Sequence, residues 1–276
     1  MRIALLTLEA VAASRAVRRF VAAEAGRIAL VGLSDPYRGS AGGASGQLLR
    51  RLRLSGPRIL PYLAANFTAP RLAGLLRRPP ADDGLACPLP LTCRRLGIPV
   101  LVVDDVNGPA FRQALAQSGA DLLVSFHFDQ ILSAELIAAP RLGGINVHAG
   151  LLPDHRGPVP TIHALLDDPV RFGVSVHRLA PRIDAGALLA QAEMGDEPGL
   201  SALSAAARLH EAALPLLARV LADLETGRAA ERPLPLQPYR PFPTGAELRR
   251  LARKGRRLAG WHDLAEAWRL PVRDRA

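Results

Sequence analysis

Asparagine, histidine and aspartate residues occur in this sequence at a spacing that would let one site use all three. Asn146 and His148 lie two residues apart in a segment with the composition of a β-strand, so both side chains leave the same face. The segment runs into Leu151-Leu152-Pro153, and because proline cannot continue a strand ladder, we expect the pair at a strand end. In α/β sheets, ligands bind at the carboxyl ends of strands. The carboxylate is Asp184, in the later segment 183–186.

These three side-chain types suit acyl transfer without a protein nucleophile. A histidine with a pKa near neutrality removes a proton from an attacking amine or hydroxyl and returns it to a leaving nitrogen. An asparagine amide donates to a carbonyl oxygen that acquires negative charge, which is often worth roughly 3 kcal/mol. A buried aspartate holds the imidazole, raises its pKa or orients a water. The motif contains no serine or cysteine that could form an acyl-enzyme, and nothing in it resembles a nucleophile elbow.

The elements that would position these residues alternate between strands and helices, as in a parallel sheet. Hydrophobic patterns predict strands over residues 2–8, 27–32, 99–104, 121–128, 173–179 and 187–192, and one more around Asn146. They predict helices over residues 14–25, 109–117, 161–166 and 200–225, and a short one after Ser133. The segment 34–91 is broken by glycine and proline and cannot be assigned. The expected fold is α/β, with a doubly wound, mainly parallel sheet.

The domain organisation follows from the last third of the sequence. A catalytic domain is expected over residues 1–226, with a possible kink of its last helix at Pro215 and Gly227 as the helix stop. Residues 227–276 would form a proline-rich linker and a helical C-terminal extension. In that extension, Thr244 and Glu247 have the spacing of a capping box.

Composition limits the class of protein. About half of the residues (49%) are apolar, but no apolar run is long enough to span a bilayer, so a soluble protein is expected. The first eight residues read as a core strand rather than a signal peptide. The two cysteines, Cys87 and Cys93, are too few for a disulfide scaffold and lack the paired spacing of a zinc site. A reducing cytoplasm is therefore the expected compartment.

The formal charge of +10 raises the question of an anionic partner. Every basic residue except Lys254 is arginine, and much of the excess lies before residue 80, where basic and apolar residues alternate. Such a segment can lie on phosphate, on an acidic membrane surface or in water. Because a charge run alone is weak evidence, a solvated face is the plainest interpretation.

Several linked motifs resemble the formyltransferase family that uses 10-formyltetrahydrofolate, whose members formylate methionyl-tRNA, glycinamide ribonucleotide or sugar amines. The resemblance covers about residues 95–195, and Ala149-Gly150 departs from it by replacing the usual Pro-Ser. The matching motifs are Asn146-Val147-His148, Leu151-Leu152-Pro153, Arg156-Gly157, Gly173-Val174-Ser175-Val176-His177 and Asp184 with Gly186.

The resemblance implies a site and a substrate. Asn146 and His148 would stabilise the tetrahedral adduct and move protons, and Asp184 would orient the imidazole or a bridging water, with no metal required. Supporting roles would fall to His177, Leu152 and Pro153. The pteridine would lie against the backbone of two loops, which consist here of Asp129, Gln130, Ile131 and Leu132, and of Ala180, Pro181, Arg182 and Ile183.

The residues near these motifs also have plainer interpretations. His127, His155 and His163 read as ordinary polar residues, and Phe126 and Phe128 suit core packing as well as contact with the pteridine. Residues 239–243 could cover an acceptor pocket, but a strap that docks the tail is the simpler account.

The expected partners are a folate and an amine acceptor, and three other functions stay open. A hydrolase would give the formyl group to water with the same residues. Formylation of transfer RNA would use the arginine-rich N-terminal third, and its binding would depend steeply on salt. A non-catalytic folate-binding or scaffold protein would not need the intact catalytic set. The identity of the acceptor and the oligomeric state are left undetermined by the sequence.

Overall fold

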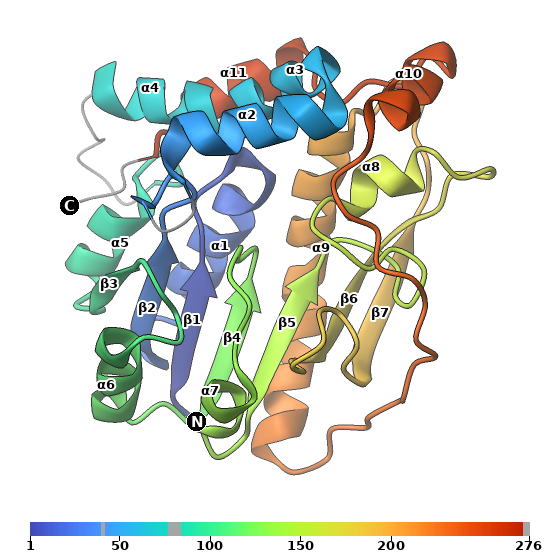
Figure 1. Cartoon of the computed structure of the whole chain (residues 1–276). Helices are drawn as coiled ribbons and strands as arrows, with labels where there is room; N and C mark the ends of the chain where they lie inside the picture. Colours follow the sequence, from blue (N-terminus) through green and yellow to red (C-terminus); the bar gives the residue numbers. More distant parts are fainter. Residues whose placement is uncertain (40–41, 77–83, 273–276) are drawn as a thin grey trace.

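The described part of the computed structural model, residues 1–39, 42–76 and 84–272, contains one seven-stranded sheet (Figure 1). Its strands lie in the order β3-β2-β1-β4-β5-β6-β7. The first five are parallel, whereas β6 runs antiparallel to β5 and β7 antiparallel to β6. The strands are β1 (Ile3–Thr7), β2 (Ile28–Ser34), β3 (Val100–Val103), β4 (Leu122–Phe126), β5 (Gly144–His148), β6 (Phe172–Arg178) and β7 (Leu188–Met194). The predicted, mainly parallel α/β sheet is confirmed.

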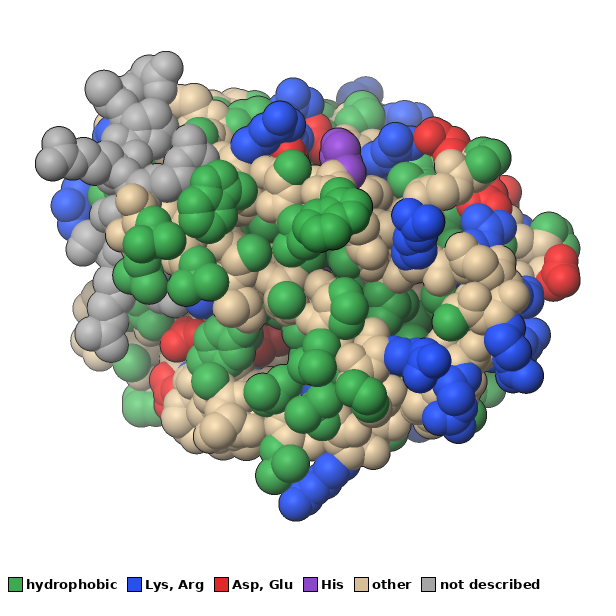
Figure 2. All heavy atoms as spheres, turned by 90° about the horizontal axis from the view of Figure 1, so that it is seen from above, with side chains coloured by type: hydrophobic (Ala, Val, Ile, Leu, Met, Phe, Trp, Pro, Cys, Tyr) green, Lys and Arg blue, Asp and Glu red, His purple; other side chains and the backbone are tan. Residues whose placement is uncertain are grey.

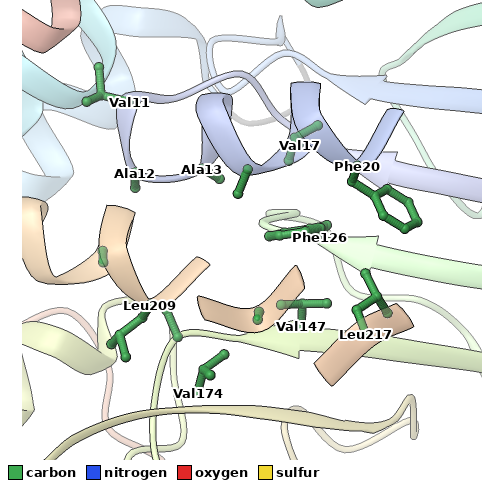
Figure 3. Packing of buried hydrophobic residues seen from close by; sticks show 14 of the residues in the cluster. Val11, Ala12, Ala13, Val17, Phe20, Phe126, Val147, Val174, Leu209 and Leu217 are labelled. Carbon is green, nitrogen blue, oxygen red and sulfur yellow. The ribbon is translucent and has the colours of Figure 1, made fainter. Parts of the chain in front are cut away.

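Helices cover both faces of the sheet (Figure 1). On one face, α1 (Val11–Ala23) and α9 (Ala202–Glu225) enclose the larger hydrophobic core, in which Phe126 and Val147 lie between the two helices and the sheet (Figure 3). On the other face, α6 (Pro109–Ser118) and α7 (Ala134–Ala138) enclose a smaller core. Two shorter helices pack beside them: α5 (Leu89–Arg95) lies next to α1, and α8 (Pro160–Ala164) lies next to α9.

A third group of helices crosses above the carboxyl ends of the central strands (Figure 1). The segment that could not be assigned from the sequence contributes α2 (Gly43–Ser55), a 3-10 turn (Pro57–Ile59), α3 (Leu60–Leu63), a π-helical turn (Ala64–Thr68) and α4 (Ala69–Leu76). The C-terminal region adds α10 (Gly245–Arg253), which packs on α2, and α11 (Trp261–Arg269), which packs on α4. These helices form a roof over the edge where a ligand site is expected.

One sequence expectation is corrected at an element boundary. α1 begins at Val11 rather than Ser14, because the Ser14 hydroxyl donates to the Ala10 carbonyl (2.9 Å) inside the first turn instead of capping the helix. α9 continues through Pro215 as a single helix. The capping box is confirmed: the Thr244 hydroxyl accepts from Glu247 N (3.2 Å), and Thr244 N donates to Glu247 Oε2 (2.7 Å). Within the described residues, no helix combines the length and apolarity that crossing a membrane requires.

Candidate active site

The centre of the site is a cross-strand group on β5 and β6. Ile145 and Val147 point into the core under α1 and α9, so the alternate residues Asn146 and His148 face the other way. In the antiparallel register Asn146 lies opposite His177, and His148 lies opposite Ser175. The pairing therefore brings His177 to the same face, and Asn146 Nδ2 lies 3.1 Å from His177 Nε2.

Hydrogen bonds to carbonyl groups fix which ring nitrogens carry protons. His148 Nε2 lies 2.8 Å from the His155 carbonyl oxygen, which only accepts, so this nitrogen donates. Neutral His148 therefore has its lone pair on Nδ1, which lies 3.7 Å from Asp184 Oδ1. His177 is the opposite tautomer: Nδ1 donates to the Arg178 carbonyl (2.8 Å), and Nε2 accepts from the Asn146 amide.

Asp184 occupies the middle of this group. Its backbone lies in the left-handed region (φ 47°), and its side chain is only 8% exposed. Oδ2 accepts from Gly157 N (2.9 Å), while Oδ1 lies 3.5 Å from Asn146 Nδ2 and 3.6 Å from His177 Nε2. Burial opposes ionisation of this carboxyl, but His148, His177 and the Gly157 N–H outweigh it and lower its pKa to about 2. Asp184 is thus a carboxylate at neutral pH.

His148 is neutral at the same pH. Burial lowers its pKa below the ordinary value, although the nearby Asp184 carboxylate opposes this shift in part. An imidazole with a free Nδ1 lone pair beside a fixed carboxylate can accept a proton, because the ion pair then formed stabilises the imidazolium. The arrangement therefore suits a general base.

Arg156 and Gly157 hold the aspartate loop in place. The buried Arg156 guanidinium donates to the carbonyls of Ile183 and Asp184, the latter at 3.1 Å from Nε. Gly157 has φ 133°, and a Cβ there would come within 2.0 Å of the Arg240 carbonyl oxygen. Only glycine fits this position, so the Arg-Gly motif is explained by packing and backbone conformation.

The loop after β5 is fastened to β6 and β7 by Ser175. Its hydroxyl donates to the Gly150 carbonyl (2.7 Å) and accepts from Leu152 N (3.1 Å). A Cβ at Gly150 would lie 2.8 Å from His148 Nε2. The glycine in the Ala149-Gly150 departure thus allows the loop to pack closely against the imidazole.

A cavity of about 840 Å³ opens in front of these side chains and beneath the roof helices. Asn146, His148, His177 and Asp184 all line it. Of the two predicted pteridine loops, the lining includes Asp129, Gln130, Ile131, Leu132, Ala180 and Ile183. It does not include Pro181, Arg182, Leu152 or Pro153 among the residues that the structure describes. Within those residues, no group of three or more His, Cys, Asp or Glu side chains could hold a metal ion.

The polar side chains of the first loop are engaged by the protein itself. Asp129 accepts from the Ser34 hydroxyl (2.6 Å) and from Arg38 (2.7 Å). Gln130 donates to the Val103 carbonyl (2.9 Å). These contacts tie the loop to the ends of β2 and β3, so the two side chains have structural partners.

A proline-rich strap, residues 233–243, closes one side of the cavity. Tyr239, Pro241 and Phe242 line the cavity. His163 Nε2 donates to the Pro241 carbonyl (2.7 Å), and the Arg51 guanidinium lies 3.3 Å from the centre of the Phe242 ring. The strap therefore both docks the C-terminal region, as the sequence suggested, and covers the cavity.

Two histidines that the sequence did not select also line the cavity. His127, which follows β4, has φ 57°, and its buried Nε2 has no hydrogen-bond partner among the residues that the structure describes. His210 of α9 donates from Nδ1 to the Ala12 carbonyl (2.7 Å), and its ring lies edge-on to that of His127 at 5.4 Å. Burial lowers the pKa of His127 to about 4 and that of His210 to about 3. Their proximity depends on tertiary packing, which no local pattern reveals.

Comparison with known families adds an independent result. The family model described as formyl transferase matches residues 104–221. This span runs from the end of β3 into α9 and contains all four polar side chains at the centre of the site, namely Asn146, His148, His177 and Asp184.

Solved formyltransferase structures share the fold at low sequence identity. A sugar N-formyltransferase from Shewanella sp FDAARGOS_354 is 19% identical, with 88% of this chain and 77% of that chain covered and a TM-score of 0.51. A phosphoribosylglycinamide formyltransferase from Anaplasma phagocytophilum is 17% identical (81% and 87% covered, TM-score 0.53). WlaRD, a sugar 3N-formyl transferase solved in the presence of dTDP and 5-N-formyl-THF, is 14% identical (99% and 82% covered, TM-score 0.55). The chain is therefore similar to formyl transferases over residues 104–221, and it shares its fold with these solved structures.

Proposed function

We propose that this protein transfers a formyl group from 10-formyltetrahydrofolate to the amine of an acceptor. The observation that carries the proposal is the position of Asn146, His148 and Asp184, whose polar atoms converge on one wall of a large cavity. An amide donor, a neutral imidazole and a fixed carboxylate supply the groups that acyl transfer to an amine requires.

His148 would move the protons. In the reaction, the acceptor nitrogen bonds to the formyl carbon, and the bond from that carbon to the folate nitrogen breaks. His148 Nδ1 takes the proton that the attacking amine loses and returns it to the leaving nitrogen. Asp184 stays ionised throughout, because its pKa is about 2, and stabilises the imidazolium.

Asn146 would donate to the formyl oxygen as negative charge develops there. Its Nδ2 now donates to His177 Nε2 (3.1 Å) and lies at the longer distance of 3.5 Å from Asp184 Oδ1. The contact with Asp184 is too long for a strong hydrogen bond, so the Asn146 amide hydrogen on that side is the one that would be donated to the formyl oxygen. His177 would position the amide by accepting the other hydrogen.

The formyl donor would lie along the loops 129–132 and 180–183. Four residues of the first loop and two of the second line the cavity, whose volume lies in the range of small-molecule sites. The similar fold of WlaRD, which was solved in the presence of 5-N-formyl-THF, supports a folate donor. None of the relatives named above is described as a transfer-RNA formyltransferase, so a small-molecule amine is the preferred acceptor class.

The test follows release of tetrahydrofolate from 10-formyltetrahydrofolate, with and without a pool of amines that includes amino sugars. We expect release with acceptors, and a loss of about two to four orders of magnitude in the variant His148→Ala. His262→Ala is the matched control, because His262 is an exposed histidine on α11 outside the cavity lining, and it should retain wild-type activity.

Other outcomes would contradict the proposal in distinct ways. Release that needs no amine and is lost in His148→Ala would identify a hydrolase. Normal turnover by the double variant Asn146→Ala, His148→Ala would exclude the mechanism described here. Saturable folate binding without turnover across the amine panel would favour a non-catalytic folate-binding protein.

A further inference from the structure

The positive charge of this protein is concentrated in the roof helices and the C-terminal region. Residues 42–76 contain five arginines and no acidic residue, and residues 244–272 contain seven basic and three acidic residues. Together the two segments carry +9 of the formal charge of +10. The net positive charge is therefore concentrated in these two segments rather than spread evenly along the sequence.

The three acidic residues of these segments do not offset that charge at the surface. Glu247 is engaged by Thr244 in the capping box, and Glu266 pairs with Arg15. Asp263 is buried and accepts from two serine hydroxyls. Eight arginines are exposed: Arg50, Arg53, Arg58, Arg249, Arg250, Arg253, Arg257 and Arg269.

The same helices expose large apolar side chains. Leu75 is 79% and Leu76 73% exposed on α4, and Trp261 is 86% exposed on α11, which packs against α4. Figure 2 looks down on this face and shows hydrophobic side chains gathered across its middle, with Lys and Arg side chains around them. The other large apolar side chains exposed on these helices are Leu48, Leu49, Leu54, Leu60, Leu72, Leu264 and Trp268.

This apolar surface continues into the active-site cavity. Leu48 and Leu54 of α2 and Leu72 and Leu75 of α4 are exposed and also line the cavity. Exposed leucines in such number are unfavourable in water, and contiguous apolar patches rimmed by polar residues mark interaction sites. The partner of this face must therefore supply both negative charge and an apolar environment.

We propose that the roof helices α2, α3 and α4, together with α10 and α11, dock on an anionic lipid bilayer. Anionic headgroups would neutralise the exposed arginines, and the leucines and tryptophans would enter the boundary between headgroups and acyl chains. A nucleic acid would satisfy the arginines but leave the leucines in water, which makes it the less suitable partner. The inference is independent of the proposed reaction, because it concerns a surface rather than a catalytic step.

Both tryptophans of the chain, Trp261 and Trp268, lie on this face, so intrinsic fluorescence reports on it directly. The test titrates the protein of residues 1–276 with vesicles of phosphatidylcholine alone or mixed with phosphatidylglycerol, and measures Trp emission and co-sedimentation. With the anionic vesicles we expect emission at shorter wavelength and pelleting that weakens as salt rises. With phosphatidylcholine alone, binding should be at least about tenfold weaker.

Two pairs of variants separate apolar insertion from charge. Leu75→Asp should weaken binding to the anionic vesicles about tenfold, whereas Leu236→Asp, a similarly exposed leucine (53%) in the strap, should not. Arg58→Glu should weaken binding about fivefold or more, whereas Arg219→Glu, exposed on α9, should not. Trp261→Ala provides a second apolar variant, and urea unfolding shows whether each variant folds like the wild type.

Three results would overturn the proposal. The first is that the wild type does not bind anionic vesicles. The second is that Leu75→Asp and Trp261→Ala, both folded, bind them as tightly as the wild type, which would indicate adsorption by charge alone. Alternatively, bulk transfer RNA would displace the protein from the vesicles while Leu75→Asp left its RNA affinity unchanged, which would indicate a nucleic-acid surface.

Discussion

Asp184 and His148 influence each other's proton affinity in opposite directions. The imidazole lowers the pKa of the carboxyl, and the carboxylate raises the pKa of an imidazole that burial would otherwise lower further. The pair is thus held as a carboxylate and a neutral base at neutral pH. Since both side chains are shielded from solvent, screening by salt should alter this balance little.

Replacing this carboxylate should shift the pH profile. In Asp184→Asn, the imidazole loses the negative charge that raises its pKa, so the acid limb of kcat/KM should move to lower pH. The maximal kcat/KM should also fall about a hundredfold, because the imidazolium is no longer stabilised. Rate measurements from about pH 5 to about pH 9 test this expectation. An unchanged acid limb would show that His148 is not the group that titrates.

Gly157 should resist substitution more than other glycines with positive φ. In Gly157→Ala, the new Cβ would meet the Arg240 carbonyl oxygen at 2.0 Å in addition to the strained backbone. We expect a loss of at least about 2 kcal/mol in the free energy of unfolding, measured with urea. Gly255→Ala is the control: φ there is 70° but the space is open, so it should cost about 1 kcal/mol. Equal losses would mean that the loop moves aside freely.

At the scale of elements, the strap should control binding more than chemistry. Phe242 lines the cavity and stacks on Arg51, and it lies far along the chain from β5 and β6. In Phe242→Ala, KM for one of the two substrates should therefore rise several-fold, with a smaller change in kcat. Leu236→Ala, in the same strap but outside the cavity lining, should leave both parameters unchanged. A fall in kcat alone would contradict the assigned role.

Strands and helices could be predicted from the sequence where burial of one face gives the apolar residues a simple periodic spacing. All seven strands were found, because each is a short apolar run or alternation between turn signals, and the Thr244 cap was recognisable from two residues. The roof helices were not predicted, because glycine and proline interrupt their segment and because α2 and α4 bury few residues, so that their leucines face water or the cavity.

For the whole molecule, buried histidines should make stability depend on pH. His127 and His210 have pKa values of about 4 and about 3, against about 6.5 in an unfolded chain, so the unfolded state binds more protons below about pH 6.5. Stability should therefore fall as the pH is lowered, by about 2 kcal/mol for each histidine at about pH 5.

A variant can isolate this contribution. His127→Asn removes the titrating group and tolerates the left-handed backbone at φ 57°. Its loss of unfolding free energy between about pH 7.5 and about pH 5, measured with urea, should be smaller than that of the wild type by about 2 kcal/mol. His262→Asn, at an exposed position, should lose as much as the wild type. Identical losses in all three proteins would show that His127 is protonated in the folded state.

The site was only partly accessible from the sequence. Asn146 and His148 could be paired by the period of a strand, but Asp184 entered through its spacing within a family motif. His177 was singled out, yet whether it faced the cleft depended on the register of β6 against β5. The contribution of Ser175, and the approach of His127 to His210, arise from contacts between distant segments that only the folded chain brings together.

One guanidinium links the strap to the aspartate loop. Arg156 donates to the carbonyls of Ile183 and Asp184 on one side and to that of Gln237 in the strap on the other. If the strap swings outward to admit a ligand, this shared anchor loosens the loop that holds the carboxylate against His148. The open strap and the paired His148 and Asp184 side chains would then exclude each other. The carboxylate would be positioned beside the imidazole only after the strap has closed over the substrates.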